Sequence, residues 1–170
     1  MKVFLIGFMG SGKSTAAKKL ASRLGYECLD LDALIEQGEG STIDEIFRQE
    51  GEGKFRQLEY KYLRELKDKQ QVVIATGGGT PCYNGNMGYM NATGITVYLK
   101  MTPAQLHSRL KKAAGNRPLL NRQDGEDLLQ SIVQKLDVRE RFYRQATLIV
   151  NGFDLDVKAL ADKIIRWLKQ

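Results

Sequence analysis

The sequence has few of the residues that mark secreted, zinc-binding or membrane-spanning proteins. Its two cysteines, Cys28 and Cys82, do not amount to a disulfide framework, so a reduced cytoplasmic setting is expected. Together with the single histidine, His107, they lack the spacing of zinc ligands. No apolar run approaches the length of a membrane span, and glycines interrupt the apolar start too soon for a signal peptide. We therefore expect no membrane partner.

The chain has a moderate excess of positive charge, with 26 Lys and Arg against 20 Asp and Glu, a net charge of +6. A content of 42% hydrophobic and 27% charged residues is typical of a globular protein, and 170 residues suffice for one domain spanning 1–170. The basic residues form no consecutive block and no aromatic-interleaved RNA-binding signature, so no nucleic-acid partner is expected. We interpret the charge as serving phosphates and a carboxylate of small substrates.

Residues 7–15 fit the phosphate-binding P-loop pattern G-x-x-x-x-G-K-[ST]. A β-rich apolar strand over residues 3–6 precedes them, and a helix from Lys13 to Leu24, ended by Gly25, follows. In this context the backbone amides and the helix dipole point at phosphate oxygens. Lys13 can reach the outer phosphates, and the hydroxyl of Ser14 can bind Mg²⁺. The predicted nucleotide-binding residues are Gly10, Ser11, Gly12, Lys13, Ser14 and Thr15.

Two carboxylates follow the first helix. Residues 26–32 are predicted to form a strand, which would place Asp30 and Asp32 on one face near its carboxyl end. Ligands of parallel α/β sheets bind at that end, so one acid could hold water on Mg²⁺ while the other accepts a proton from a substrate hydroxyl. The alternative is that Asp32 only caps the helix that begins at Ala33.

Helical spacing next predicts two consecutive helices that bring an arginine and a glutamate together. Thr42 and Glu45 match a capping box, and the helix they begin is expected to end near Gly51. A longer helix from residue 52 places Arg56 and Glu59 three residues apart, where they could pair. The alternative is a surface ion pair of little energetic value.

Two further segments have the composition of ligand-binding loops. Three glycines, residues 77–79, follow a buried strand over 71–76 and indicate either a bulky group close to the backbone or a flexible turn. Residues 111–125 are rich in basic residues and resemble a mobile lid that excludes water during phosphoryl transfer. Arg117 within them could stabilise the transferring phosphoryl group. The alternative is a solvated loop.

The remaining pattern predicts strands over 95–99 and 147–150 and helices over about 85–92, 102–110, 127–144 and 155–168. The fold class is therefore α/β, with a central parallel sheet of five strands flanked by helices in three layers.

The ordered set of motifs resembles the shikimate kinases, which are P-loop kinases of the nucleoside monophosphate kinase type. The segments that carry the resemblance are residues 7–15, 29–32, 55–59, 77–79 and 117–120, with Arg139 four residues before Tyr143. The resemblance implies ATP-dependent phosphorylation of the 3-hydroxyl of shikimate, giving shikimate 3-phosphate and ADP in aromatic amino acid biosynthesis. A monomer is expected.

The resemblance also implies roles on the acceptor side, within about residues 32–62 and beyond. Asp32 would bind the shikimate hydroxyls and act as the base. Arg56 and Arg139 would clamp the carboxylate, with Glu59 orienting Arg56. Gly78 would contact the substrate through its backbone.

On the phosphate side the resemblance implies that Lys13 and Arg117 contact the phosphates of ATP, with Arg117 in the lid. Ser14 would serve Mg²⁺ directly and Asp30 would serve it through water. Arg109 is a candidate for the arginine that stacks on adenine in this family, although a gap-free count from Arg117 gives Leu110.

Three alternative functions share parts of this pattern. A gluconate kinase would also need arginines for an acidic polyol. A nucleotide-dependent binding module would lack transfer activity, and a nucleic-acid binder would show salt-dependent affinity for DNA or RNA. The sequence itself departs from the family pattern at residues 80–82, Thr-Pro-Cys, where a small residue and a valine are more usual.

Overall fold

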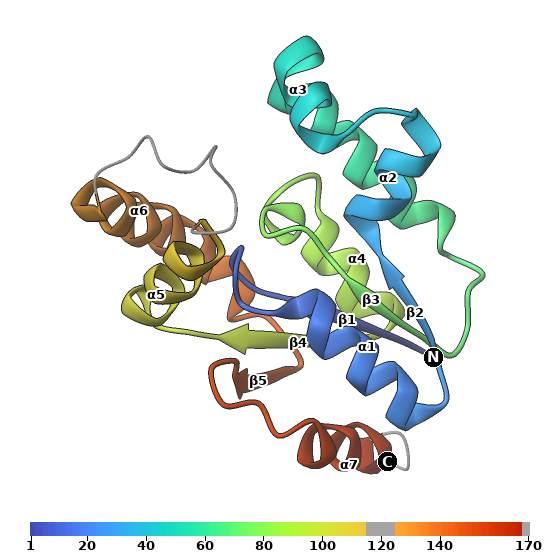
Figure 1. Cartoon of the computed structure of the whole chain (residues 1–170). Coiled ribbons are helices and arrows are strands. Elements are labelled where there is room, and N and C mark those ends of the chain that lie inside the picture. Colours follow the sequence, from blue (N-terminus) through green and yellow to red (C-terminus); the bar gives the residue numbers. More distant parts are fainter. Residues whose placement is uncertain (115–124, 168–170) are drawn as a thin grey trace.

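A five-stranded parallel sheet forms the centre of the computed structural model, which describes residues 1–114 and 125–167 (Figure 1). The strands are β1 (Lys2–Ile6), β2 (Glu27–Asp30), β3 (Val72–Ala75), β4 (Ile95–Lys100) and β5 (Leu148–Asn151). Their order is β2-β3-β1-β4-β5, and Val3 of the central strand pairs with Val73 on one side and Ile95 on the other. The predicted parallel sheet is confirmed.

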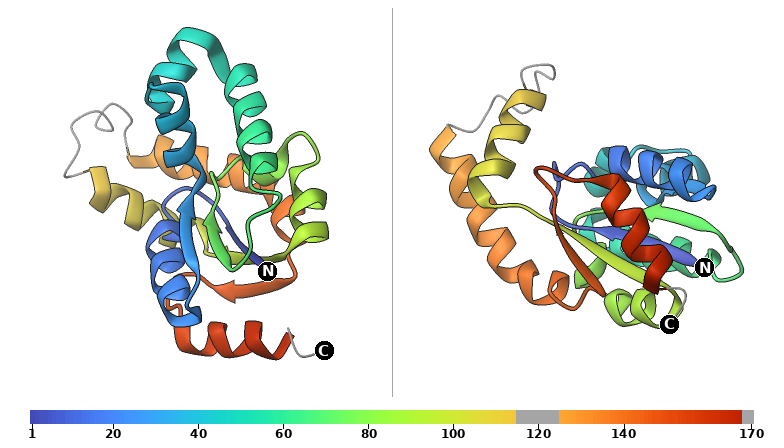
Figure 2. Two further views of the ribbon diagram at one scale, coloured as in Figure 1. Left: turned by 90° about the vertical axis from the view of Figure 1, so that its right-hand side faces the viewer. Right: turned by 90° about the horizontal axis from the view of Figure 1, so that it is seen from below.

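Helices cover both faces of this sheet. They are α1 (Lys13–Leu24), α2 (Leu31–Glu39), α3 (Ile43–Glu65), α4 (Asn86–Thr93), α5 (Pro103–Ala114), α6 (Gly125–Tyr143) and α7 (Val157–Trp167), with a short 3-10 turn, η1 (Thr80–Cys82). Alternate residues of β1 point to opposite faces: Val3 and Leu5 pack with α1 and α7, whereas Phe4 and Ile6 pack with α2, α3, α4 and α6. The resulting three layers, visible in Figure 2, match the predicted architecture.

Local signals place several helix ends as predicted. Helix α1 ends at Leu24, where Gly25 adopts a left-handed conformation with φ 69°. Thr42 and Glu45 form the complete capping box that begins α3. Gly51, with φ 83° and ψ 172°, interrupts α3 and separates the two helical segments that the sequence indicates.

The predicted strand over residues 26–32 is wrong at its end. Strand β2 stops at Asp30, whose side chain caps α2 by accepting hydrogen bonds from the amides of Asp32 and Ala33. Asp32 therefore lies in the first turn of α2, and the two acids do not share a strand face. The N-cap preference of aspartate outweighs the extended pattern here, and the capping residue is Asp30, not Asp32.

Three segments of the candidate site begin at the same edge of the sheet. The carboxyl ends of β1, β2 and β3 lead into the P-loop, α2 and the triple glycine respectively. In Figure 1, α2 and α3 lie together at one end of the sheet, and α5 and α6 lie side by side at the other. Within the described ranges no helix is both long and apolar enough to cross a membrane.

Candidate active site

The P-loop follows β1, runs into the start of α1 and contains every predicted nucleotide-binding residue except Arg117. Gly10 and Gly12 have φ values of 79° and 87°, which residues other than glycine rarely adopt. Lys13 is buried, and its Nζ donates to the carbonyl oxygens of Gly7 at 2.8 Å and Phe8 at 2.9 Å. Burial lowers the pKa of Lys13 to about 8, although the nearby carboxylates of Asp32 and Asp30 oppose this change. Incoming phosphate oxygens can replace these carbonyls as acceptors.

Ser14 and Asp30 form a pair of hard oxygen ligands beside the loop. The Ser14 hydroxyl donates to Asp30 Oδ2 at 2.6 Å, while Asp30 Oδ1 holds the start of α2. Mg²⁺ needs one or two such protein oxygens because phosphates and water complete its octahedron. Among the residues that the structure describes, no group of three or more His, Cys, Asp or Glu could hold a metal by itself. The pair therefore fits a metal carried in with a nucleotide.

Asp32 lies between the P-loop and the triple glycine. Its Oδ1 atom is buried and has no hydrogen-bond partner among the described residues. Burial is the main cause that raises the pKa of Asp32 from 3.8 to about 6, and the negative charges of Asp30 and Glu59 raise it further while Lys13 lowers it. Such a carboxylate can accept a hydrogen bond, and then a proton, from a hydroxyl group.

Arg56 is held in place by α3 and by the segment after η1. Its Nη1 donates to Glu59 Oε2 at 2.6 Å, and its Nε and Nη2 donate to Glu52 Oε1 at 3.1 and 2.9 Å. The guanidinium lies over the ring of Tyr83, 4.3 Å from its centre. Because Glu59 is fully buried, this ion pair is not the weak surface pair of the alternative interpretation.

Gly78 packs closely between Arg139 of α6 and the backbone of the P-loop. A Cβ atom at this position would lie 3.1 Å from the Met9 amide nitrogen and 3.3 Å from Arg139 Nη1, so only glycine fits comfortably. The carbonyl of Gly78 accepts a hydrogen bond from the Tyr143 hydroxyl at 2.5 Å. Tyr143 lies four residues after Arg139 on α6 and fixes this helix against the glycine loop.

Some of these groups line a cavity of about 760 Å³, here called the P-loop cavity because Met9 of the P-loop also lines it. The predicted residues that line it are Asp32, Arg56, Gly78 and Arg139. Sequence reasoning missed Glu52, Cys82 and Tyr83, which also line it. The four-residue spacing from Glu52 to Arg56 on a helix was a usable signal for the first. No sequence pattern indicated the other two, since they depend on how η1 turns back toward α3.

A smaller cavity of about 340 Å³ lies on the other side of the P-loop and includes Thr15. Arg109 reaches it from α5 and donates to the carbonyl oxygens of Ser11 and Phe153, both at 3.1 Å. This placement favours Arg109 over Leu110 as the candidate for contact with a nucleotide base. The predicted lid over 111–125 falls largely outside the described residues, and Arg117 lies outside them.

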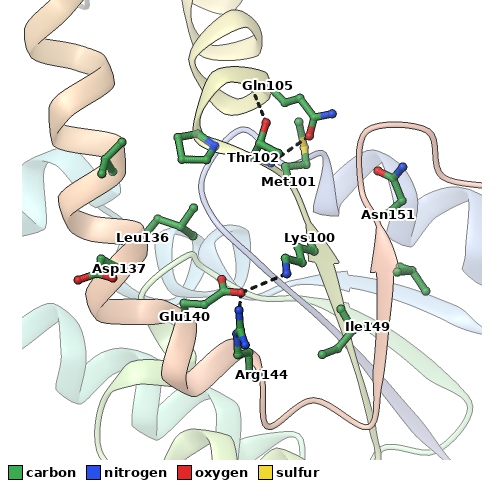
Figure 3. A pocket seen from close by; sticks show the side chains of 13 residues that line it. Lys100, Met101, Thr102, Gln105, Leu136, Asp137, Glu140, Arg144, Ile149 and Asn151 are labelled. Carbon is green, nitrogen blue, oxygen red and sulfur yellow. Dashed lines mark hydrogen bonds and ion pairs between the residues drawn. The ribbon is translucent and has the colours of Figure 1, made fainter.

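Another cavity, of about 650 Å³, lies between α5, α6 and the strands β4 and β5 (Figure 3). Glu140 is central to its polar part and pairs with Arg144 at 3.1 Å and Lys100 at 3.8 Å. None of the predicted site residues lines this cavity. The convergence of predicted residues therefore selects the P-loop cavity as the candidate active site.

A family model described as shikimate kinase matches residues 9–169. The chain belongs to the shikimate kinase family. A shikimate kinase of Bacteroides fragilis is 41% identical over 170 residues, which cover 100% of this chain and 95% of the relative. The crystal structure of shikimate kinase from Bacteroides thetaiotaomicron has a TM-score of 0.90 at 38% identity, covering 100% of this chain and 99% of the other.

A second solved member of the shikimate kinase family comes from Acinetobacter baumannii and is a complex with shikimate. It has a TM-score of 0.82 at 36% identity and covers 99% of this chain and 92% of that chain. Family membership makes this chain an ATP-binding P-loop kinase, an enzyme class whose reaction requires a divalent metal.

Proposed function

We propose that the protein transfers the γ-phosphoryl group of ATP to the 3-hydroxyl of shikimate, producing shikimate 3-phosphate and ADP. The observation that carries the proposal is the P-loop cavity, in which two arginines and a carboxylate of raised pKa lie within reach of the phosphate-binding loop. A substrate that bears one carboxylate and several hydroxyls has complementary chemistry. The solved relative in complex with shikimate supports this choice.

The acceptor would be oriented by its carboxylate. Arg56 and Arg139 enter the P-loop cavity from α3 and α6, and arginine recognises a planar carboxylate with two parallel hydrogen bonds. Nε and Nη2 of Arg56 donate to Glu52, whose side chain is 54% exposed. We infer that the substrate carboxylate exchanges for Glu52, whereas the buried Glu59 keeps its contact. The backbone of Gly78 would support the ring of the substrate.

The reacting hydroxyl would lie against Asp32. As the hydroxyl oxygen forms its bond to the γ-phosphorus, its proton passes to the Asp32 carboxylate, and the bond from phosphorus to the bridging oxygen of ADP breaks. The pKa of about 6 suits this role because the carboxylate is ionised at neutral pH yet is more basic than an ordinary aspartate.

The phosphates would be held on the opposite side by the P-loop amides, with Lys13 transferring its hydrogen bonds from the carbonyls of Gly7 and Phe8 to the outer phosphates. Ser14 would bind Mg²⁺ directly and Asp30 through water. Mg²⁺ bound there would neutralise charge on the phosphates. The contact of Arg117 with the transferring group stays a prediction.

We further propose that residues 1–170 form one domain, with acceptor binding centred on about 32–62 and a lid over about 111–125, and that the protein acts as a monomer. We assign the activity to the cytoplasm because both thiols, Cys28 and Cys82, are free.

The proposal is tested by coupling ADP release to NADH oxidation, with shikimate or gluconate as acceptor and Mg²⁺ present. We expect turnover with shikimate, and ³¹P and ¹H NMR of the product should place the phosphate on the 3-oxygen. Turnover with gluconate alone would identify another sugar-acid kinase. Nucleotide binding without turnover on either acceptor would indicate a binding module.

A further inference from the structure

Thr80 donates a short hydrogen bond into the Arg56–Glu59 pair. Its side chain is fully buried at the start of η1, and its Oγ1 lies 2.5 Å from Glu59 Oε1. The other oxygen of Glu59 accepts from Arg56. The carboxylate that orients Arg56 is therefore held at one oxygen by the arginine and at the other by this threonine, which comes from a different loop 21 residues away.

Burial makes this second contact energetically important. A fully buried carboxylate needs hydrogen bonds on both oxygens, because an unpaired buried acceptor loses its hydration without compensation. A Cβ atom on Gly77 would lie 2.9 Å from Glu59 Oε1, 3.0 Å from Asp32 Oδ1 and 3.0 Å from Thr80 Oγ1, so all three oxygens surround one point. The Thr80 hydroxyl can donate only one hydrogen bond, and it donates that bond to Glu59. Asp32 Oδ1 therefore stays available to accept a hydrogen bond from a substrate hydroxyl.

The backbone of Thr80 is itself fixed by buried groups. Its amide donates to the Gly77 carbonyl at 3.2 Å, and its own carbonyl accepts from Asn86 Nδ2 at 3.0 Å. Asn86 is fully buried, and its Oδ1 accepts from Arg64 Nη1 at 2.5 Å. A continuous hydrogen-bonded series therefore runs from Arg64 on α3 through η1 and back to Arg56 on the same helix. Such a series leaves the Thr80 hydroxyl little freedom to turn elsewhere.

We propose that Thr80 is a positioning residue for acceptor binding. It acts through Glu59 and holds the Arg56 guanidinium in the orientation that receives the acceptor carboxylate. This inference rests on the proposed function, because it concerns the affinity for a carboxylate-bearing acceptor and predicts no effect on the nucleotide side, where Lys13 and the P-loop amides act.

The test uses three variants of the full chain. Thr80→Val keeps the shape of the side chain and removes the hydroxyl, whereas Thr80→Ser keeps the hydroxyl. Thr96→Val is the matched control: Thr96 is also fully buried and its hydroxyl also donates to an oxygen, Asn91 Oδ1 at 2.6 Å. It lies on β4, and Asn91 does not line the P-loop cavity, whereas Glu59, the partner of Thr80, does. Thermal unfolding identifies folded variants, and Thr80→Ala replaces Thr80→Val if the latter does not fold.

For Thr80→Val we expect KM for shikimate to rise about tenfold, equivalent to about 1.4 kcal/mol, with KM for ATP changed by less than about twofold. Thr80→Ser should return KM for shikimate to within about threefold of the parent value, and Thr96→Val should leave both constants unchanged. In an Arg56→Gln background, Thr80→Val should change KM for shikimate by less than about twofold, because its effect passes through Arg56.

A normal KM for shikimate in Thr80→Val would overturn the inference. So would an equal rise in both KM values, or a full tenfold effect in the Arg56→Gln background, since each would mean a general structural role. These outcomes differ from failure of the proposed function, in which the unmodified protein itself shows no shikimate-dependent turnover and the inference falls with it.

Discussion

Replacing Asp32 by asparagine should separate catalysis from nucleotide binding. Asparagine has nearly the same shape but cannot take the hydroxyl proton, and general-base catalysis contributes about 10²–10⁴-fold to a rate. We therefore expect kcat with shikimate to fall by at least about 100-fold. The nucleotide contacts through the P-loop are untouched, so KM for ATP should stay within about threefold of the parent value.

The pH dependence of the same reaction should report the ionisation of Asp32. The pKa of about 6 means that the carboxylate is about nine-tenths ionised at pH 7 and about one-tenth ionised at pH 5. The value of kcat/KM for shikimate should accordingly be level above about pH 7 and fall about tenfold per pH unit below pH 6. The residual activity of Asp32→Asn should lack this acidic limb.

The stability of the folded protein should fall as the pH rises, whereas the activity rises. Because folding raises the pKa of Asp32 from 3.8 to about 6, the folded protein retains a proton between these values that the unfolded chain has released. The free energy of unfolding therefore falls as the pH rises through this window. The full pKa difference corresponds to about 3 kcal/mol, and the partial solvent exposure of Asp32 reduces the expected loss to about 2 kcal/mol. Asp32→Asn should unfold at a higher urea concentration than the parent at pH 7.5, and the difference should vanish below about pH 4.

Asp162→Asn is the matched control, since Asp162 is exposed on α7 and remote from the P-loop cavity. It should alter neither kinetics nor stability beyond experimental error. The reasoning would be refuted if Asp32→Asn retained kcat within about tenfold of the parent. It would also be refuted if the variant were less stable than the parent at pH 7.5, because Asp32 would then contribute favourable contacts that outweigh its cost of burial.

Three other results are expected. Lys13→Ala should lower kcat with every acceptor tested and weaken ADP binding in calorimetry, because Lys13 acts on the phosphates; an effect confined to one acceptor would contradict this. Tyr143→Phe removes the hydrogen bond to the Gly78 carbonyl, so KM for shikimate should rise several-fold and urea unfolding should show a loss of about 1 kcal/mol, with KM for ATP unchanged. Chelation by EDTA should abolish turnover and excess Mg²⁺ should restore it, whereas activity that persists in EDTA would remove the metal role of Ser14 and Asp30.

The features that could be predicted from the sequence are those set by neighbouring residues. The P-loop, the capping box at Thr42 and the break at Gly51 depend on backbone preferences of a few consecutive residues, and the structure has all three. The five parallel strands of the sheet also match the predicted α/β class. The predicted end of β2 was wrong because the same residues satisfy two local rules, the extended pattern and the N-cap, and the N-cap hydrogen bonds of Asp30 outweigh the extended pattern.

The contacts that complete the candidate site join residues far apart in the chain. Thr80 meets Glu59 across 21 residues, and Tyr143 meets Gly78 across 65. No periodicity or spacing encodes such pairs, because they depend on where η1 and α6 come to rest against the sheet. The sequence could therefore name candidate ligand-binding groups, but the contacts made by Thr80 and Tyr143 required the fold.

The hydrogen-bond partners of the charged groups in the site bear on how the two substrates would be selected. Lys13 is satisfied by backbone carbonyls and Arg56 by two glutamates, so a phosphate or a carboxylate only exchanges one acceptor for another. Asp32 Oδ1 differs, because it is a buried acceptor without a donor in the described part of the chain. In the proposed reaction a substrate hydroxyl would supply that donor, and its gain would be largest when the two arginines hold the substrate carboxylate in place. The proposed selectivity for an acidic alcohol would then come from coupling these two requirements across Gly77 and Gly78, the short stretch of backbone that lies beside both.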